Sequence, residues 1–339
     1  MKKYLVIAII LISWFLPSCN KANIADYSAP QTKQTAMSQA TVNRSIPPST
    51  TVSLGSLPDY LTVFTNGSND ANWQGATKGF CGDMFINGAI ANERTSGNVP
   101  FGGTIYTNKN ELGDWQDIIN DNPGQSHVKK LQTEKMAGLI TDFDDAMANM
   151  AALSATPGYT SVSATSLNGL NTMDGVAQTI VINITSNMHV TSQINITGDD
   201  DDMYILRWDT DANSGNGYQG TVKFSSGGAI VPQGELKATN FINVAGNISS
   251  SGGGSTPSSP YPQGPRFNNG TGALVNGGAD FNGGGFFTGY WLTTGDPVTG
   301  ITSSLSNAVF VGGWYTSSTR FSMTSGTSGV HVKKPQVLN

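Results

Sequence analysis

From Leu57 onward the chain alternates short apolar or β-branched runs with clusters of Gly, Asn, Ser and Asp. Runs of this length bounded by turn-forming residues are typical of short β-strands. The pattern therefore predicts a mainly β protein. The expected strands are Tyr60–Phe64, Asp83–Ile90, Gly103–Tyr106, Thr179–Ile184, Gln193–Thr197, Met203–Trp208, Thr221–Phe224, Phe241–Val244 and Ala308–Val311.

One segment, Ser126–Leu153, follows a different period. Its large apolar residues recur at steps of three and four, which predicts a single amphipathic α-helix over about 126–153. Ser126 can cap its start, and Pro157-Gly158 can stop it. A long helix in a β chain must dock along the β body to bury its apolar stripe, which comprises Val128, Leu131, Met136, Leu139, Ile140, Phe143, Met147 and Met150.

The first residues predict export. Lys2 and Lys3 precede an apolar run from Tyr4 to Leu16, which is too short for a membrane span and suits a signal peptide over residues 1–18. Leu16-Pro17-Ser18-Cys19 resembles a bacterial lipobox. The resemblance implies that Cys19 is lipidated and anchors the protein in a membrane, and we expect this to be at the outer membrane or the cell surface. An ordinary secretory signal beside an unrelated cysteine is the alternative.

Residues 19–56 are rich in Ser, Thr, Ala, Gln and Pro, so we expect a flexible tether with little packing. The folded domain is expected over 57–332, with a tail at 333–339. Ser249–Gly264 has low complexity and predicts a surface loop.

The composition of the chain limits the classes of partner that it suits. The 339 residues include 41 glycines, 12% charged residues and a net charge of −5. This acidic chain has no basic run, so nucleic acid is an improbable partner. With Cys19 lipidated, Cys81 is left alone and is expected to be a buried, inert thiol.

Three stretches carry a resemblance to a known family: Gly82–Ala89, Asp142–Asn149 and Phe241–Ile248. Together with the inserted helix, they resemble bacterial ice-binding-protein-like domains and the related choice-of-anchor-A surface adhesins. The resemblance implies an irregular right-handed β-solenoid (β-helix) with the helix packed alongside. In the adhesin branch it implies attachment to a polymer, matrix or other surface.

The ice-binding branch calls for threonines repeated in register on a flat face. Here the nearest candidates are Thr179, Thr185, Thr191 and Thr197, which are spaced six residues apart. A solenoid rung takes roughly 20 residues, so an ordinary strand pair with exposed threonines is the competing interpretation.

No nucleophile-elbow, P-loop, zinc or dinucleotide motif occurs, and the three histidines are scattered. Asp209, Asp211 and Asn213 have the one-three-five oxygen spacing of calcium loops, without the glycine and glutamate that usually follow. An acidic surface turn is the simpler interpretation. The cluster Asp199–Asp202 leaves a polysaccharide-active enzyme open as a further alternative.

Aromatic residues crowd the C-terminal, glycine-rich region. If exposed, Tyr290, Trp291, Trp314 and Tyr315 could stack on sugar faces or grip a protein partner. Core filling is the favoured interpretation, since large aromatic residues usually bury most of their area. The sequence thus favours a non-catalytic, lipid-anchored adhesion or binding domain without a required cofactor, ahead of ice binding and of a polysaccharide-active enzyme.

Overall fold

The structure is a computed structural model that describes residues 52–73, 79–89, 103–107, 128–130, 133–208, 221–251, 266–267, 274–275, 285–295, 303–306, 308–318, 320–324 and 328–331. The signal peptide, Cys19, the C-terminal tail and the calcium-loop residues Asp209, Asp211 and Asn213 lie outside the described residues. Those assignments remain predictions.

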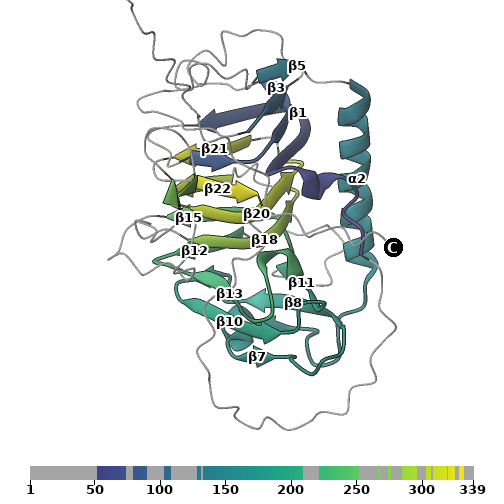
Figure 1. The fold of residues 1–339 in the computed structure, drawn as a ribbon, viewed down its shortest axis with the longest axis vertical. Coiled ribbons are helices and arrows are strands. Elements are labelled where there is room, and N and C mark those ends of the chain that lie inside the picture. Colours follow the sequence, from purple (N-terminus) through teal and green to yellow (C-terminus); the bar gives the residue numbers. More distant parts are fainter. Residues whose placement is uncertain are drawn as a thin grey trace, which may run out of the picture.

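The described strands pair in parallel, except for the short antiparallel pair β16 (Arg266–Phe267) and β17 (Leu274–Val275). The strands stack one above another in three ladders, which lie side by side around a common interior (Figure 1). In one step of the stack, Thr179 pairs with Met203, 24 residues further along the chain. This arrangement is consistent with a β-helix.

Ladder A is the longest of the three. In order it contains β6 (Val162–Ser163), β8 (Thr179–Ser186), β11 (Met203–Trp208), β14 (Phe241–Ala245), the second half of β18 (Phe286–Thr293), the second half of β20 (Val309–Thr316), the first half of β1 (Thr62–Trp73), β3 (Met84–Ala89), β4 (Ile105–Thr107) and β5 (Val128–Lys130).

Ladders B and C complete each turn. Ladder B contains β7 (Leu170–Asn171), β10 (Gln193–Gly198), β13 (Ala229–Gly234), the first halves of β18 and β20, β22 (Ser328–His331) and β2 (Gly79–Cys81). Ladder C contains β9 (His189–Val190), β12 (Thr221–Ser225), β15 (Asn247–Ser251), β19 (Ser303–Ser306), β21 (Arg320–Thr324) and the end of β1. Short 3₁₀ turns, η2 (Leu57–Asp59), η4 (Ala164–Leu167) and η5 (Ala238–Asn240), link some of the strands.

All nine strands expected from the sequence are present. Most of their ends shift by a few residues, but β1 continues to Trp73 and β20 to Thr316, well beyond the expected Phe64 and Val311. Two local predictions were wrong. The helix, α2, spans Thr133–Ala152 and does not begin at Ser126, because Val128–Lys130 instead form β5 and pair with β4. Ser249–Ser251 belong to β15 rather than to a loop, because β12 offers them a parallel backbone partner.

The first described strand, β1, lies in the middle of the stack. β1 pairs on one side with β3 and on the other with β20, so that Thr62 lies opposite both Met84 and Trp314. The chain climbs through β3, β4 and β5, and α2 then returns it to the far end, where β6 and β8 begin (Figure 1). A helix of 20 residues is about 30 Å long. That matches the six strand spacings of about 4.8 Å from β3 to β8.

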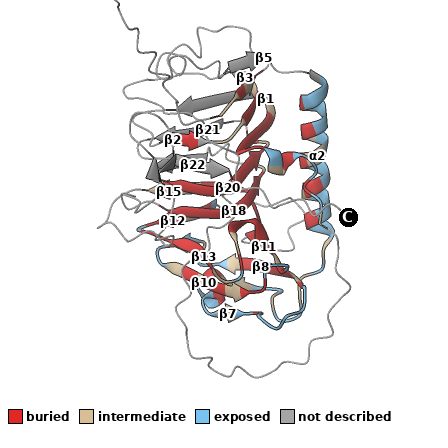
Figure 2. Ribbon diagram, in the orientation of Figure 1, coloured by how far each residue is buried: buried red, intermediate tan, exposed pale blue. Residues whose placement is uncertain are grey.

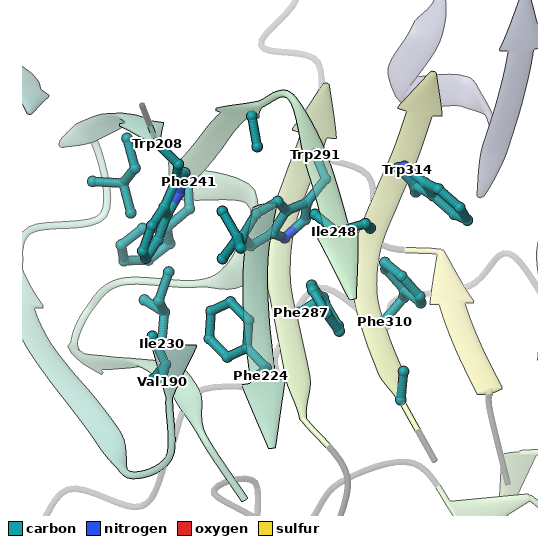
Figure 3. Close-up of a cluster of buried hydrophobic side chains, with 14 of the residues drawn as sticks. Val190, Trp208, Phe224, Ile230, Phe241, Ile248, Phe287, Trp291, Phe310 and Trp314 are labelled. Carbon is teal, nitrogen blue, oxygen red and sulfur yellow. The ribbon is translucent and has the colours of Figure 1, made fainter. Parts of the chain in front are cut away.

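Two apolar clusters hold this arrangement together. One fills the interior and includes Trp208, Phe224, Phe287, Trp291 and Trp314 (Figure 3). The other lies between ladder A and the buried stripe of α2 (Figure 2), where Met136, Leu139, Phe143, Ala146 and Met150 meet Phe85, Val181, Ile205, Ile242, Tyr290 and Tyr315. The predicted docking of the helix on the β body is confirmed, and the stripe begins at Met136. Among the described residues, no helix is both long and apolar enough to cross a membrane.

Glycines form the corner where β18 and β20 turn from ladder B into ladder A. Gly289 has a φ of 92° and Gly312 a φ of 137°. A Cβ on Gly312 would lie only 2.1 Å from the carbonyl oxygen of Gly289 in the next turn. Only glycine allows the two backbones to approach this closely at positive φ.

The segment before η2 is packed, contrary to the expected tether over 19–56. Leu54 is 7% exposed and belongs to the cluster under α2. The backbone N–H of Ser56 donates to Asp142 Oδ2 on the helix at 2.8 Å. Residues 52–56 are therefore part of the folded body, because they cover apolar surface between α2 and ladder A.

Arg207 on β11 caps the C-terminal end of α2. Its Nη1 donates to the carbonyl oxygens of Met150 at 3.2 Å and Leu153 at 2.8 Å, while its Nε donates to Asn183 Oδ1 at 2.8 Å. The last turn of α2 contains no basic residue of its own. A guanidinium at this end satisfies carbonyls that lack intrahelical partners and opposes the helix dipole.

We therefore expect Arg207→Met to lower the free energy of unfolding by about 1.5–3 kcal/mol, the usual contribution of hydrogen bonds to a charged group. Urea denaturation followed by circular dichroism measures it. Arg207→Lys keeps the charge but loses the planar fork, so it should recover only part of the loss. Equal stability of Arg207→Met and wild type would contradict this role.

Candidate functional site

Because strands alternate their side chains between two sides, each ladder has an outer side that faces away from the interior. The outer side of ladder A is covered by α2 and by residues 52–60. At the start of α2, Lys135 Nζ lies 5.4 Å from the ring centroids of both Tyr60 and Phe85 and 5.7 Å from that of Tyr106. This cation–π contact and the Arg207 cap fix the two ends of the helix. Ladder A is therefore closed to a ligand beneath α2.

The four aromatic residues that could have formed a binding surface if exposed are buried. Trp291 and Trp314 face the interior, where their Nε1 atoms donate to Thr288 O at 3.2 Å and to Thr293 Oγ1 at 2.9 Å. Tyr290 and Tyr315 face the other way and stack beneath α2, with centroids 6.2 Å apart. Core filling, the interpretation that the sequence favoured, is confirmed. Burying such large rings stabilises the fold more than exposing them.

The four candidate threonines do not form one surface. Thr179 and Thr185 lie on β8 in ladder A, Thr191 lies in the turn after β9, and Thr197 lies on β10 in ladder B. Thr185 Oγ1 is engaged with Ser161 Oγ at 2.7 Å. A step of six residues carries the chain around a corner instead of up one rung, so this predicted ice face was wrong.

Ladder B has a polar end and an apolar middle. Gln193, Asn195 and Thr197 on β10 are half-buried and face outward, since they alternate with the core residues Ile194 and Ile196. Further along the ladder the corresponding positions are Val231, Val309 and Val311, each at most 2% exposed. The middle of ladder B therefore presents no exposed side chain among the described residues.

Ladder C is different, because small polar residues occupy its outer positions. Val222, Phe224 and Ile248 belong to the interior cluster, so Thr221, Lys223 and Ser225 on β12 and Ser249 and Ser251 on β15 lie on the outer side. Thr221 is exposed, and Lys223, Ser249 and Ser251 are partly exposed. β12 and β15 lie on the side of the body away from α2 (Figure 1).

The register extends these positions into rows. One row joins His189, Lys223, Ser249, Ser304, Ser322 and Asn72, and a neighbouring row joins Ser225 with Ser251 and Ser306 with Thr324. Adjacent rungs are about 4.8 Å apart, and alternate residues along a strand are about 6.6 Å apart. We call the positions of these two rows from Ser249 and Ser251 onward the hydroxyl face. It is a regular two-dimensional array of short polar residues on a hydrogen-bonded backbone.

Sequence reasoning missed the hydroxyl face. Its members lie on β-strands separated by loops of unequal length, so they have no constant spacing. The one visible signal was the run of serines at 249–251, which was interpreted as part of a loop.

Two of the four clustered aspartates, Asp199 and Asp202, are buried at the corner between β10 and β11. Asp202 accepts hydrogen bonds from Thr172 Oγ1 at 2.6 Å and from the backbone N–H of Gln178 at 3.1 Å. Asp199 Oδ2 accepts from the backbone N–H groups of Asp174 at 2.9 Å and Gly175 at 2.7 Å. Through these hydrogen bonds the two carboxylates hold the β7–β8 loop against the end of the stack, so their role is structural.

Burial also changes the acidity of this corner. Desolvation raises the pKa of Asp202, although its hydrogen bonds oppose that effect. It likewise raises the pKa of Tyr204, whose hydroxyl contacts Thr172 Oγ1. In the part of the chain that the structure describes, no group of three or more His, Cys, Asp or Glu side chains could hold a metal ion.

Comparison with known proteins finds similarity of structure only. No family model and no curated protein sequence matches this chain. Among solved structures, the DUF3494 domain of ice-binding protein 1 from Shewanella frigidimarina aligns over 86% of this chain and 100% of its own, with 12% identity and a TM-score of 0.46. An ice-binding protein from an Antarctic biological consortium aligns over 85% and 95%, with 15% identity and a TM-score of 0.47. The ice-binding protein LeIBP from an Arctic yeast aligns over 85% and 98%, with 12% identity and a TM-score of 0.45. At this similarity no function is transferred from these proteins.

The raised pKa of Asp202 makes a testable contribution to the pH dependence of stability. A carboxyl group whose pKa is higher in the folded state stabilises the fold below its unfolded pKa, and this contribution is lost as pH rises through the folded pKa. We expect the unfolding free energy of wild type minus that of Asp202→Asn to decrease from about pH 3 toward neutrality. Urea denaturation of both proteins across this range measures it, and an increase with pH would contradict the desolvated environment.

Proposed function

We propose that this protein is a non-catalytic ice-binding protein and that the hydroxyl face is its contact surface. The observation that carries the proposal is the register of ladder C, which aligns Ser249 with Ser304, Ser304 with Ser322, and Ser322 with Asn72. Small polar residues thereby repeat at each rung over four successive strands.

Binding to a crystal surface of water calls for many weak contacts held at fixed spacing. A serine hydroxyl both donates and accepts hydrogen bonds, as water does. A short side chain loses little conformational entropy when it is ordered. The parallel ladder fixes the spacing before ice is met, so contact requires little further ordering of the protein. Repeats of about 4.8 Å and about 6.6 Å are on the length scale of the oxygen lattice of ice.

Attachment to a glycan by aromatic stacking is less well supported. The rings that would have stacked on sugars are Tyr290, Trp291, Trp314 and Tyr315, and all four are buried. The carboxylates proposed for a polysaccharide-active enzyme include Asp199 and Asp202, whose oxygen atoms are engaged in the corner described above. Ice binding through the hydroxyl face therefore replaces adhesion through aromatic rings as the leading function.

The predicted lipid anchor fits this role without being required by it. We propose that Cys19, if lipidated, holds the hydroxyl face outside the membrane at the cell surface. A membrane-tethered ice-binding domain would act where external ice meets the cell.

Replacing Ser249 with tyrosine should remove most of the ice activity, because the ring would project from the flat array and keep neighbouring hydroxyls from the ice surface. Thermal hysteresis and inhibition of ice recrystallisation by the purified protein measure it. Ser251→Tyr, in the neighbouring row, should act in the same way.

Thr141→Tyr is the matched control, since Thr141 is exposed on α2, and β12 and β15 lie on the side of the body away from α2 (Figure 1). It should retain the activity of wild type. Melting curves show that each variant is folded. Absence of thermal hysteresis in wild type, or equal activity of the Ser249 and Thr141 variants, would overturn the proposal.

A further inference from the structure

One end of ladder C adjoins the hydroxyl face and carries the positive charge of Lys223. His189 on β9 and Lys223 on β12 occupy the same row in adjacent rungs, directly before Ser249. His189 is exposed, and its Nε2 lies 2.7 Å from Oγ of the buried Ser225. We call His189 and Lys223, with the exposed hydroxyl of Thr221, the cationic end.

The charge of Lys223 is not used within the described part of the protein. Its backbone N–H donates to Met188 O at 2.9 Å, but its ammonium group pairs with no described carboxylate. The side chain is partly exposed and lies on a ladder whose neighbouring outer positions are hydroxyl-bearing. In a chain with 18 basic and 23 acidic residues, an unpaired lysine in register with a histidine is a local departure from the overall charge.

Such a charge does not suit an ice surface, which is neutral and would have to displace the water bound to the ammonium group. It does suit an anionic oxygen, because an ammonium and an imidazole N–H both donate to carboxylate or sulfate groups. The row continues from Lys223 into Ser249, whose hydroxyl can hydrogen-bond to a sugar hydroxyl.

We propose that the cationic end binds an anionic polysaccharide, with a carboxylate or sulfate group at Lys223 and His189 and the sugar chain lying along the serine row. This activity goes beyond ice binding, because its charged contact lies at the cationic end, which adjoins the hydroxyl face. A repeating polymer would present many charged groups in sequence, so a weak single contact is reinforced by rebinding. Binding through exposed charges should also weaken as salt increases.

The experiment measures binding of the full chain to immobilised polygalacturonate, dextran sulfate and neutral dextran by biolayer interferometry at low salt. We expect binding to at least one of the two anionic polymers and none to dextran. The polymer that binds identifies carboxylate or sulfate as the preferred group. Lys223→Gln should weaken the binding about tenfold, as expected for the loss of a charge-assisted contact. Lys223→Arg should retain it.

Lys237→Gln is the matched control, because it removes the same charge from a position outside ladder C, next to η5. It should bind as wild type does. Equal binding to dextran, no loss in Lys223→Gln, or the same loss in Lys237→Gln would each overturn the proposal. Thermal hysteresis of Lys223→Gln, measured in parallel, separates this result from ice binding, since that activity should persist when the cationic end is lost.

Discussion

The docking of α2 on ladder A is the interaction on which the rest of the fold depends. The first described strand, β1, lies in the middle of ladder A and pairs with β20, with Thr62 opposite Trp314. That pairing requires the chain to return from β5 to β6 at the other end of ladder A, and α2 supplies about 30 Å of this path. The helix also covers the apolar outer side of ladder A, which would otherwise face water. Lys135 over the rings at one end and Arg207 at the other set its position.

The interior is built so that polar groups near the corners are satisfied, which keeps the backbone rigid. Asn243 is fully buried, accepts a hydrogen bond from Trp208 Nε1 at 3.1 Å and donates to Thr288 O at 3.0 Å. Thr288 Oγ1 in turn donates to Ile230 O in the neighbouring ladder at 2.6 Å. Connected networks of this kind favour one arrangement of a core, because each member loses a partner if another moves. A rigid interior is what allows the outer rows of ladder C to keep their spacing.

The outer sides of the three ladders differ in what they present. Ladder A is covered by α2, and the middle of ladder B presents buried valines in the described residues. In the described residues, ladder C carries short polar residues in repeated register, with the charge of Lys223 at one end. Its two zones differ in the ligands they suit: a neutral lattice of water for the serine rows, and anionic groups for Lys223 and His189.

Local pattern determined the secondary structure well, because each strand and the helix carry their own signal. Met203–Trp208 was predicted and found with the same ends, and the apolar stripe of α2 was visible from Met136 to Met150.

Pairing between strands decided the rest of the fold. Val128–Lys130 continue the helical period yet form a strand, because β4 presents an open backbone edge to them. The sequence does not show on which ladder, or on which side of it, the aromatic residues and the threonines lie, because that depends on where the chain turns its corners. The hydroxyl face was invisible for the same physical reason: Thr179 and Met203 are 24 residues apart, whereas Ser249 and Ser304 are 55 apart, although each pair is one rung apart in space. Loop length varies freely on the surface while hydrogen bonding fixes the register, so the rows exist only in the folded protein.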